Sequence, residues 1–376
     1  MTYFKRPALF ILLLLFFCLS TFTDCRAETD LKRPRVGVKL NKFEHELEVV
    51  AEELKSAGVN IVFAGRRVIN DNNFDRFLDL CHEREIEVFA IFPVFNNSKA
   101  IKQDPSLAQI DALGNPTHSE HRRWYRFVCP NRQDYRQKKI AEFRDFLIKH
   151  KVDGLSLDFI RYGVEWEMIK PEDKPGFEQE YCFCPVCLEK FKKLYQLPEG
   201  KNTIELARFI LKNHREDWTR LKCQSITSMV KEIRQAVREV RPGTKIAVHA
   251  LPWTEEDYDD GACRLGGQDF KALSQYVDIM SPMSYHYMLY RDAGSIHKVV
   301  VYISSQDCYV MPCIQAEVIF RKEDIYSAEE FQKAIRQALL APSSGINLYT
   351  WVELKKRPDC KKIWIEKLGE RHNQRR

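Results

Sequence analysis

Residues 153–162 read DGLSLDFIRY, and they decide how the rest of the chain is interpreted. The apolar run that follows the Asp-Gly turn predicts a buried strand. Asp158 does not fit such a strand, because a buried carboxylate is costly unless it is paired, hydrogen-bonded or used in chemistry. We therefore place Asp158 at the centre of a predicted functional site. The alternative is an ion pair between Asp158 and Arg161 that only stiffens the structure.

Apolar runs of this kind recur along the chain and alternate with helical patterns. They cover residues 34–40, 60–66, 86–95, 153–162, 245–253, 277–285, 308–315 and 345–351. Eight mostly apolar strands that alternate with helices indicate parallel pairing under a helical cover. The predicted fold class is α/β, a (β/α)8 TIM barrel with a cysteine-rich insertion after strand 4. A doubly wound open sheet is the alternative, but no glycine-rich phosphate loop follows the first strand.

The N-terminus predicts export. Lys5 and Arg6 precede the apolar run of residues 8–19, which is too short to span a bilayer, and Cys25-Arg26-Ala27 offers a small-x-small cleavage site. We expect a signal peptide and a secreted or periplasmic protein without a stable membrane span. An uncleaved signal anchor is the alternative.

This interpretation divides the chain into a signal peptide, residues 1–27, and one barrel domain, residues 28–376, with insertions at residues 96–132 and 163–243. Hydrophobic residues make up 44% of the 376 residues and aromatic residues 12%, which suffices for a large core and excludes a disordered chain. The net charge of +6 comes largely from basic residues near the two ends. No central basic run carries interleaved aromatics, so we expect no nucleic-acid partner.

Chemistry in a barrel of this kind lies at the carboxyl ends of the strands. The sequence places aromatic, amide and charged side chains there, and this mixture suits a sugar ring, whose faces are apolar and whose edges are polar. The predicted partner is therefore a poly- or oligosaccharide substrate. The candidate substrate-binding residues are Arg66, Arg161, Tyr162, His249, Trp253, Tyr285, His286, Gln315 and Trp351.

Cleavage of a glycosidic bond usually requires two carboxylates, one ionised and one protonated. Asp158 is the first candidate, and Glu317 and Glu255 are the leading candidates for the second, with Glu256 and Glu353 also open. A non-catalytic carbohydrate-binding barrel would keep the aromatic side chains and lack the second carboxylate. A metal-dependent hydrolase is disfavoured, because neither a His-x-His nor an HExxH spacing occurs.

Four of the strand-end segments carry a family resemblance. DGLSLDFIRY, VDIMSPMSY (residues 277–285), PCIQ (312–315) and the tryptophan of GINLYTW (345–351) resemble the strand-end motifs of secreted glycoside-hydrolase-like barrels, grouped as glycosyl-hydrolase-like family 10 and its relatives. The resemblance implies a (β/α)8 barrel that acts on a poly- or oligosaccharide. It also implies that Asp158 occupies the acidic position of these families.

A cysteine cluster follows the fourth predicted strand. Cys182, Cys184 and Cys187 lie too close together for ordinary mutual disulfides, whereas three thiolates and one further ligand form a tetrahedral structural zinc site. The segment YCFCPVCLEKF resembles the zinc loop of glycoside hydrolase family 42 β-galactosidases. That resemblance implies a fourth ligand from before the fourth strand, where Cys129 stands, and hence a Zn²⁺ cofactor held by Cys129, Cys182, Cys184 and Cys187.

Two alternatives concern these cysteines. The cluster could instead form a pair of disulfides after export, and further disulfides are open among Cys81, Cys223, Cys263, Cys308, Cys313 and Cys360. The β-galactosidases also carry an Asn-Glu acid at the end of strand four, where this chain has Leu157-Asp158-Phe159. We therefore do not transfer the galactosidase substrate to this chain.

Overall fold

The computed structural model describes residues 34–373, except for residues 118–124, 305, 307 and 319–324. The predicted signal peptide lies outside the described residues. Among the helices of the described part, none is long and apolar enough to cross a membrane.

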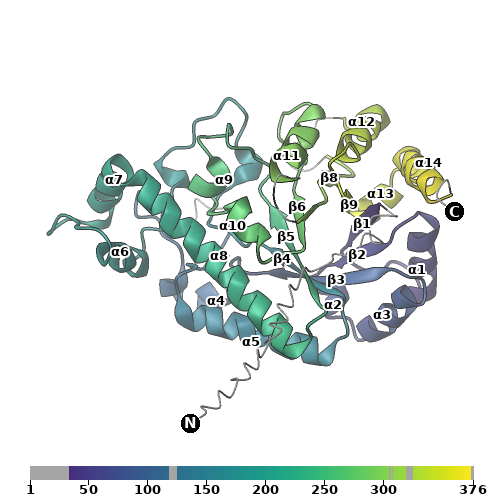
Figure 1. Cartoon of the computed structure of the whole chain (residues 1–376), viewed down its shortest axis with the longest axis horizontal. Helices are drawn as coiled ribbons and strands as arrows, with labels where there is room; N and C mark the ends of the chain where they lie inside the picture. Colours follow the sequence, from purple (N-terminus) through teal and green to yellow (C-terminus); the bar gives the residue numbers. More distant parts are fainter. Residues whose placement is uncertain (1–33, 118–124, 305, 307, 319–324, 374–376) are drawn as a thin grey trace, which may run out of the picture. The chain divides into compact units, whose positions relative to one another are not determined.

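Nine parallel strands form one curled sheet, a TIM-barrel-like α/β fold (Figure 1). Their order is β7-β6-β5-β4-β3-β2-β1-β9-β8, so that most strands lie beside their neighbours in sequence. The strands are β1 (Arg35–Leu40), β2 (Ile61–Ala64), β3 (Glu87–Pro93), β4 (Gly154–Asp158), β5 (Lys245–Ala250), β6 (Ile279–Pro282), β7 (Tyr309–Val310), β8 (Cys313–Gln315) and β9 (Gly345–Tyr349).

Both faces of the sheet are covered, which explains the near-continuous apolar runs of its strands. Inside the curl, side chains from several strands form a small apolar cluster that includes Phe63 of β2, Phe89 of β3 and Met311. The opposite face packs against the helices in the main core of the protein.

Long helices connect the strands and cover the outer face, and short helices lie in the connections (Figure 1). The longer helices are α1 (Leu47–Ser56), α3 (Phe74–His82), α5 (Gln133–Lys149), α7 (Thr203–Asn213), α8 (Arg215–Val240), α11 (Gly294–Ser304), α12 (Ala328–Ala338) and α14 (Pro358–Asn373). The shorter ones are α2 (Arg66–Ile69), α4 (Ser98–Gln103), α6 (Pro185–Lys192), α9 (Gly261–Arg264), α10 (Phe270–Ser274) and α13 (Trp351–Lys355). Short 3-10 turns in the described connections are η2 (Pro105–Leu107), η3 (Trp166–Met168) and η4 (Phe177–Gln179).

The predicted seventh strand, residues 308–315, is divided into β7 and β8. Pro312 causes the division, because proline has no N–H to donate to a neighbouring strand. The amide of Met311 still donates to the carbonyl of Met280 at 2.9 Å, and the amide of Asn347 donates to the carbonyl of Pro312 at 2.9 Å. Residues 309–315 therefore bond to β6 on one side and to β9 on the other.

The predicted fourth strand, residues 153–162, is also shorter in the structure. β4 ends at Asp158, because Phe159 adopts a left-handed conformation with a φ of 51°. A bulky residue in this region is an outlier and turns the chain sharply. Asp158 consequently stands at the carboxyl end of the strand, beside Pro93 of β3.

Candidate active site

A cavity of about 290 Å³ opens at the carboxyl ends of the strands. Lys39 of β1, Asp158 of β4 and His249 of β5 bring charged and polar groups to it. The segment after β4 supplies a second acid, Glu167. The complete lining is Lys39, Tyr125, Asp158, Phe159, Arg161, Trp166, Glu167, His249, Met283, Tyr285, Met288 and Tyr349.

Asp158 is held in its ionised form. Its Oδ1 atom accepts a hydrogen bond from the Phe159 amide at 2.8 Å. Burial by itself raises the pKa of Asp158, but this hydrogen bond and three neighbouring bases lower the pKa below its ordinary value; the bases are His249, Lys39 and Arg161.

His249 contributes little positive charge at pH 7. Burial lowers the pKa of His249 to about 4, so its imidazole is neutral there. Its Nε2 atom lies 3.1 Å from the hydroxyl oxygen of Ser156. Near neutral pH the ionised state of Asp158 therefore depends on Lys39 and Arg161.

The pKa of Glu167 is shifted in the opposite direction to that of Asp158. Burial raises the pKa of Glu167 to about 7, and the negative charge of Asp158 acts in the same sense. Arg161 and a hydrogen bond from the Tyr125 hydroxyl to Oε1 oppose this shift without cancelling it. The Oε2 atom is buried and has no hydrogen-bond partner among the described residues. The cavity thus holds one ionised carboxylate and one carboxyl that is still about half protonated at pH 7.

Arg161 supplies a buried positive charge between these two acids. Its side chain is 1% exposed, and its Nε and Nη1 atoms have no hydrogen-bond partner among the described residues. Its guanidinium carbon lies 5.0 Å from the ring centre of Phe159, 5.5 Å from that of Phe127 and 5.7 Å from that of Tyr125. Aromatic faces attract cations at these distances.

Aromatic side chains form the remaining walls. The rings of Trp166 and Tyr285 lie 5.9 Å apart, and those of Tyr285 and Tyr349 lie 5.2 Å apart. The indole Nε1 of Trp166 is buried and has no partner among the described residues. Walls of this kind can stack on a sugar ring while the acids face its glycosidic bond.

The structure brings some of the predicted substrate-binding residues to this site. Arg161, His249 and Tyr285 line the cavity, and Arg66 lines a neighbouring one. The other five predicted residues are buried and line neither cavity: Tyr162, Trp253, His286, Gln315 and Trp351. Trp253 packs on Tyr258, for example, and Gln315 donates to the carbonyl of Glu317 at 2.8 Å. The five side chains are therefore part of the protein interior and not of the cavity walls.

The two candidates for the second carboxylate do not line the cavity. Glu255 is exposed in the connection after β5. Glu317 lies beside Glu353, and burial, together with a hydrogen bond to that carboxyl, raises the pKa of Glu317. Glu167 occupies the place for which they were proposed. Glu167 lies in η3, several residues after the end of β4. A prediction based on strand ends alone therefore does not include it.

All four cysteines of the predicted cluster meet in the structure. The Sγ atoms of Cys129, Cys182, Cys184 and Cys187 lie within 4.8 Å of one another and are buried. The Sγ of Cys129 lies 3.4 Å from that of Cys187 and 3.5 Å from that of Cys184. These separations exceed the disulfide bond length of about 2.05 Å, so the thiols are not bonded to one another. The group can bind a metal ion.

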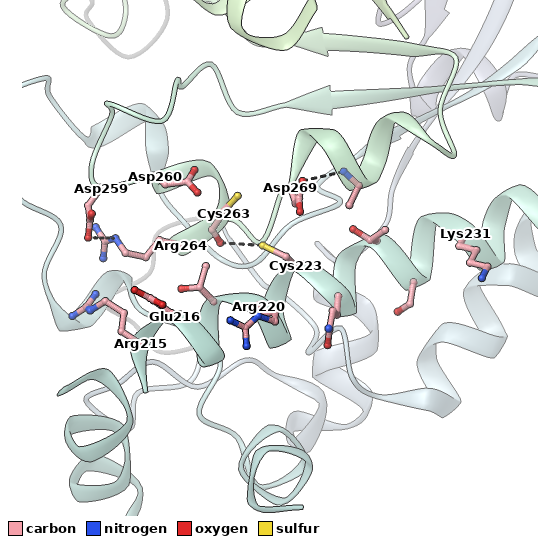
Figure 2. A pocket seen from close by; sticks show the side chains of 15 residues that line it. Arg215, Glu216, Arg220, Cys223, Lys231, Asp259, Asp260, Cys263, Arg264 and Asp269 are labelled. Atoms are coloured by element: carbon pink, nitrogen blue, oxygen red, sulfur yellow. Dashed lines mark hydrogen bonds and ion pairs between the residues drawn. The ribbon is translucent and has the colours of Figure 1, made fainter. Parts of the chain in front are cut away.

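Cys81, Cys223, Cys263, Cys313 and Cys360, for which disulfides were considered, carry free thiols as well. Cys223 and Cys263 lie in a separate cavity of about 760 Å³ along α8 and α9 (Figure 2). Charged side chains of both signs surround it, such as Arg215, Glu216 and Asp259, and no strand residue lines it. Its position on the helical layer sets it apart from the strand ends, where this fold places its chemistry.

Comparison with known proteins identifies the fold. Neither a protein-family model nor a curated protein matches the sequence. Among solved structures, the glycoside hydrolase domain of PgaB (BpsB) from Bordetella bronchiseptica is similar, with a TM-score of 0.66 and 13% identity over 88% of this chain and 98% of that one.

Two β-galactosidases share the same fold. The enzyme from the psychrophilic Marinomonas ef1 matches with a TM-score of 0.64 and 11% identity over 89% of this chain and 59% of that one. Gan42B, a GH42 β-galactosidase from G. stearothermophilus, matches with a TM-score of 0.62 and 13% identity over 92% of this chain and 57% of that one. The chain therefore spans little more than half the length of these two enzymes.

The raised pKa of Glu167 predicts a specific dependence of stability on pH. The folded protein keeps this proton up to about pH 7, whereas the unfolded chain loses it near the ordinary value of 4.5. The folded state therefore binds more protons in this window, and Glu167 makes stability fall as pH rises, by at most about 1.4 kcal/mol per pH unit. We expect Glu167→Gln to remove this slope, as measured by urea unfolding from pH 4.5 to pH 8.

Glu172→Gln is the matched control, because Glu172 is exposed in the same connection. Its stability should follow that of the unmodified protein at every pH. Parallel pH curves for Glu167→Gln and the unmodified protein would show that Glu167 is an ordinary surface carboxylate.

Proposed function

We propose that the protein is a glycoside hydrolase that cleaves a poly- or oligosaccharide with Asp158 and Glu167. The observation that carries this proposal is the pair of carboxyl groups in one strand-end cavity, whose environments move their pKa values in opposite directions. Such a pair provides the ionised and the protonated acid that glycoside hydrolysis requires.

In this mechanism Glu167 is the general acid. It donates its proton to the glycosidic oxygen, so that the leaving sugar departs as an alcohol. The anomeric carbon gains the oxygen of a water molecule in place of the broken bond. Ionised Asp158 either takes the proton of that water or first bonds to the carbon itself and is then displaced by water, which Glu167 deprotonates. Arg161 and Lys39 keep Asp158 ionised. Tyr285, Tyr349 and Trp166 hold the sugar ring.

The fold supports this assignment. The similar structures are named as a glycoside hydrolase domain and as β-galactosidases, and they share the fold of this chain. Their low identity to this chain leaves sugar and linkage to be identified by experiment. The site residues alone decide whether this chain cleaves or only binds.

Asp158→Asn and Glu167→Gln each test the catalytic pair. We expect each substitution to lower kcat by roughly 10² to 10⁴, the usual contribution of a positioned acid or base, while binding of the glycan persists. The unmodified enzyme should lose kcat/KM above about pH 7, because Glu167 then loses its proton. Reducing-end release from a polysaccharide panel, measured from pH 4 to pH 9, reports both effects.

Glu255→Gln and Glu317→Gln serve as controls, because both carboxyls lie outside the cavity. Their turnover should equal that of the unmodified protein. Glycan binding without cleavage would instead favour the non-catalytic carbohydrate-binding barrel. Loss of activity in Glu255→Gln or Glu317→Gln, with full activity in Glu167→Gln, would identify that residue as the second carboxylate.

We also propose that the cysteine cluster holds a structural Zn²⁺ ion. Zinc–sulfur bonds of about 2.3 Å place tetrahedral sulfurs about 3.8 Å apart, close to the separations within the cluster. Backbone and amide donors also face the sulfurs, as in the contact of 3.2 Å between Asn131 Nδ2 and Cys187 Sγ. Four protein ligands leave no position for a substrate, so the metal would fasten the β4–β5 connection to the segment before α5.

Zinc analysis tests the metal directly. The purified protein should contain about one equivalent of zinc by elemental analysis, and Cys184→Ser should lose most of it and unfold at a lower temperature. Cys308→Ser is the control, because Cys308 lies outside the cluster, and it should retain the zinc. Less than a tenth of an equivalent in the unmodified protein would contradict the proposal.

Two further proposals follow from the sequence and the sheet. Residues 309–315 bond to β6 and β9, which supports closure of the sheet into a (β/α)8 barrel that a crystal structure would test. The basic and apolar N-terminus supports export to the periplasm or the exterior. N-terminal sequencing of the exported protein tests this: a start near Glu28 agrees, and an intact Met1 does not.

A further inference from the structure

A second cavity adjoins the site and is strongly basic. It has a volume of about 830 Å³ and follows the ends of β2 and β3 toward α4 and α5. Phe159 lines both cavities, so the two are neighbours. Its charged residues are Arg66, Lys99, Lys102, Lys139 and Glu142, that is, four positive charges and one negative, a net charge of +3.

Most of the positive charges in this second cavity have no ion-pair partner among the described residues. Lys139 is buried, and its Nζ atom pairs with the Glu142 carboxylate at 2.7 Å. Arg66, Lys99 and Lys102 are exposed, and none of them has an ion-pair partner among the described residues. Exposed basic side chains are ordinarily solvated surface. These three differ because they line a cavity that shares the wall residue Phe159 with the site.

The first cavity carries an excess of positive charge as well. Lys39 and Arg161 contribute two positive charges and Asp158 one negative charge, which leaves +1 while Glu167 is protonated and His249 is neutral. Arg161 also has two buried N–H groups without partners among the described residues. A buried guanidinium with unused donors is costly, and a carboxylate on a ligand in the cavity would offset its charge.

We propose that the substrate is a polysaccharide that carries carboxylate groups, as in a chain of uronic acids. One carboxylate binds the guanidinium of Arg161 beside the bond that is cleaved. Those of neighbouring sugars lie along Arg66, Lys99 and Lys102. This inference rests on the proposed glycoside hydrolase function and names the class of its substrate.

A glycan is favoured over a nucleic acid as the polyanion. The basic cavity leads to a site with two opposed carboxyls and aromatic walls, which suits a glycosidic bond. The charges also gather at one end of the sheet and form no extended basic face with interleaved aromatics.

A matched panel of polymers tests the proposal. Alginate, polygalacturonate and hyaluronan supply carboxylates; dextran, xylan and galactan are neutral; dextran sulfate and single-stranded DNA supply other anions. We expect cleavage of at least one carboxylated polymer, with kcat/KM at least about tenfold above that for any neutral one, in line with the value of one charge-assisted contact. The other anions should bind at least about tenfold more weakly.

The variant Arg66→Gln/Lys99→Gln/Lys102→Gln tests the basic cavity. We expect its Kd for the cleaved polymer to rise at least about tenfold at about 50 mM salt and to approach that of the unmodified protein at about 500 mM, because salt screens exposed charges. The matched control is Lys192→Gln/Lys193→Gln/Lys212→Gln, three exposed lysines that line neither cavity. Its Kd should not change.

Arg161→Lys tests the buried guanidinium. It keeps the charge and loses the fork, so KM for the carboxylated polymer should rise about tenfold while the melting temperature stays the same. A fall in melting temperature with equal losses on all substrates would show that Arg161 is only structural.

The outcomes separate this inference from the function on which it rests. Cleavage of a neutral glycan as efficiently as of a carboxylated one overturns the substrate class and leaves the hydrolase intact. Equal affinity for dextran sulfate or DNA shows that the cavity senses charge alone, which also overturns the inference. Failure to cleave any polymer, with Asp158→Asn indistinguishable from the unmodified protein, overturns the proposed function itself.

Discussion

The electrostatic balance around Asp158 is the interaction on which the candidate site depends. A carboxylate at the end of a buried strand would lose its charge to burial, and two nearby cations, Lys39 and Arg161, prevent this. The same Arg161 also acts on Glu167, but there burial prevails and the pKa rises to about 7. One guanidinium thus serves two buried acids. Their protonation differs because Lys39 and the Phe159 amide also act on Asp158, whereas the negative charge of Asp158 acts on Glu167.

The connection between β4 and β5 holds this arrangement in place. It carries Arg161, Trp166 and Glu167 into the cavity and then supplies three of the four clustered cysteines. Glu180 of the same connection is buried. It pairs with Arg215 at 2.9 Å and Lys222 at 3.5 Å, and also with Arg264. These two anchors attach the first part of the connection to α8 farther along it, to α9 and to the segment before α5. The position of Glu167 therefore depends on contacts well away from the cavity.

Much of the fold could be predicted from the sequence, because parallel strands under a helical cover are continuously apolar and short. The order of the strands and the location of Asp158 follow from that pattern. The division of the seventh strand at Pro312 and the end of the fourth strand at Phe159 depend on local backbone constraints, which the apolar pattern does not report.

The site was harder to predict than the fold. Trp253 and Trp351 stand near strand ends, yet both are buried outside the cavity, and sequence does not distinguish a ring that faces a ligand from one that faces the core. Glu167 belongs to a 3-10 turn within a long connection, so strand-end counting missed it. The sequence did carry one indication of Glu167. In Glu165-Trp166-Glu167 an acid stands on each side of a tryptophan.

The central claim is that Asp158 and Glu167 stand on the two sides of one glycosidic bond. A crystal structure of the Asp158→Asn protein with a bound oligosaccharide tests it most directly. The claim predicts a sugar ring against Tyr285 and Tyr349, with the glycosidic oxygen within hydrogen-bond distance of Glu167 and the anomeric carbon facing residue 158. An oligosaccharide bound elsewhere, or with Glu167 out of reach of the glycosidic oxygen, would contradict it.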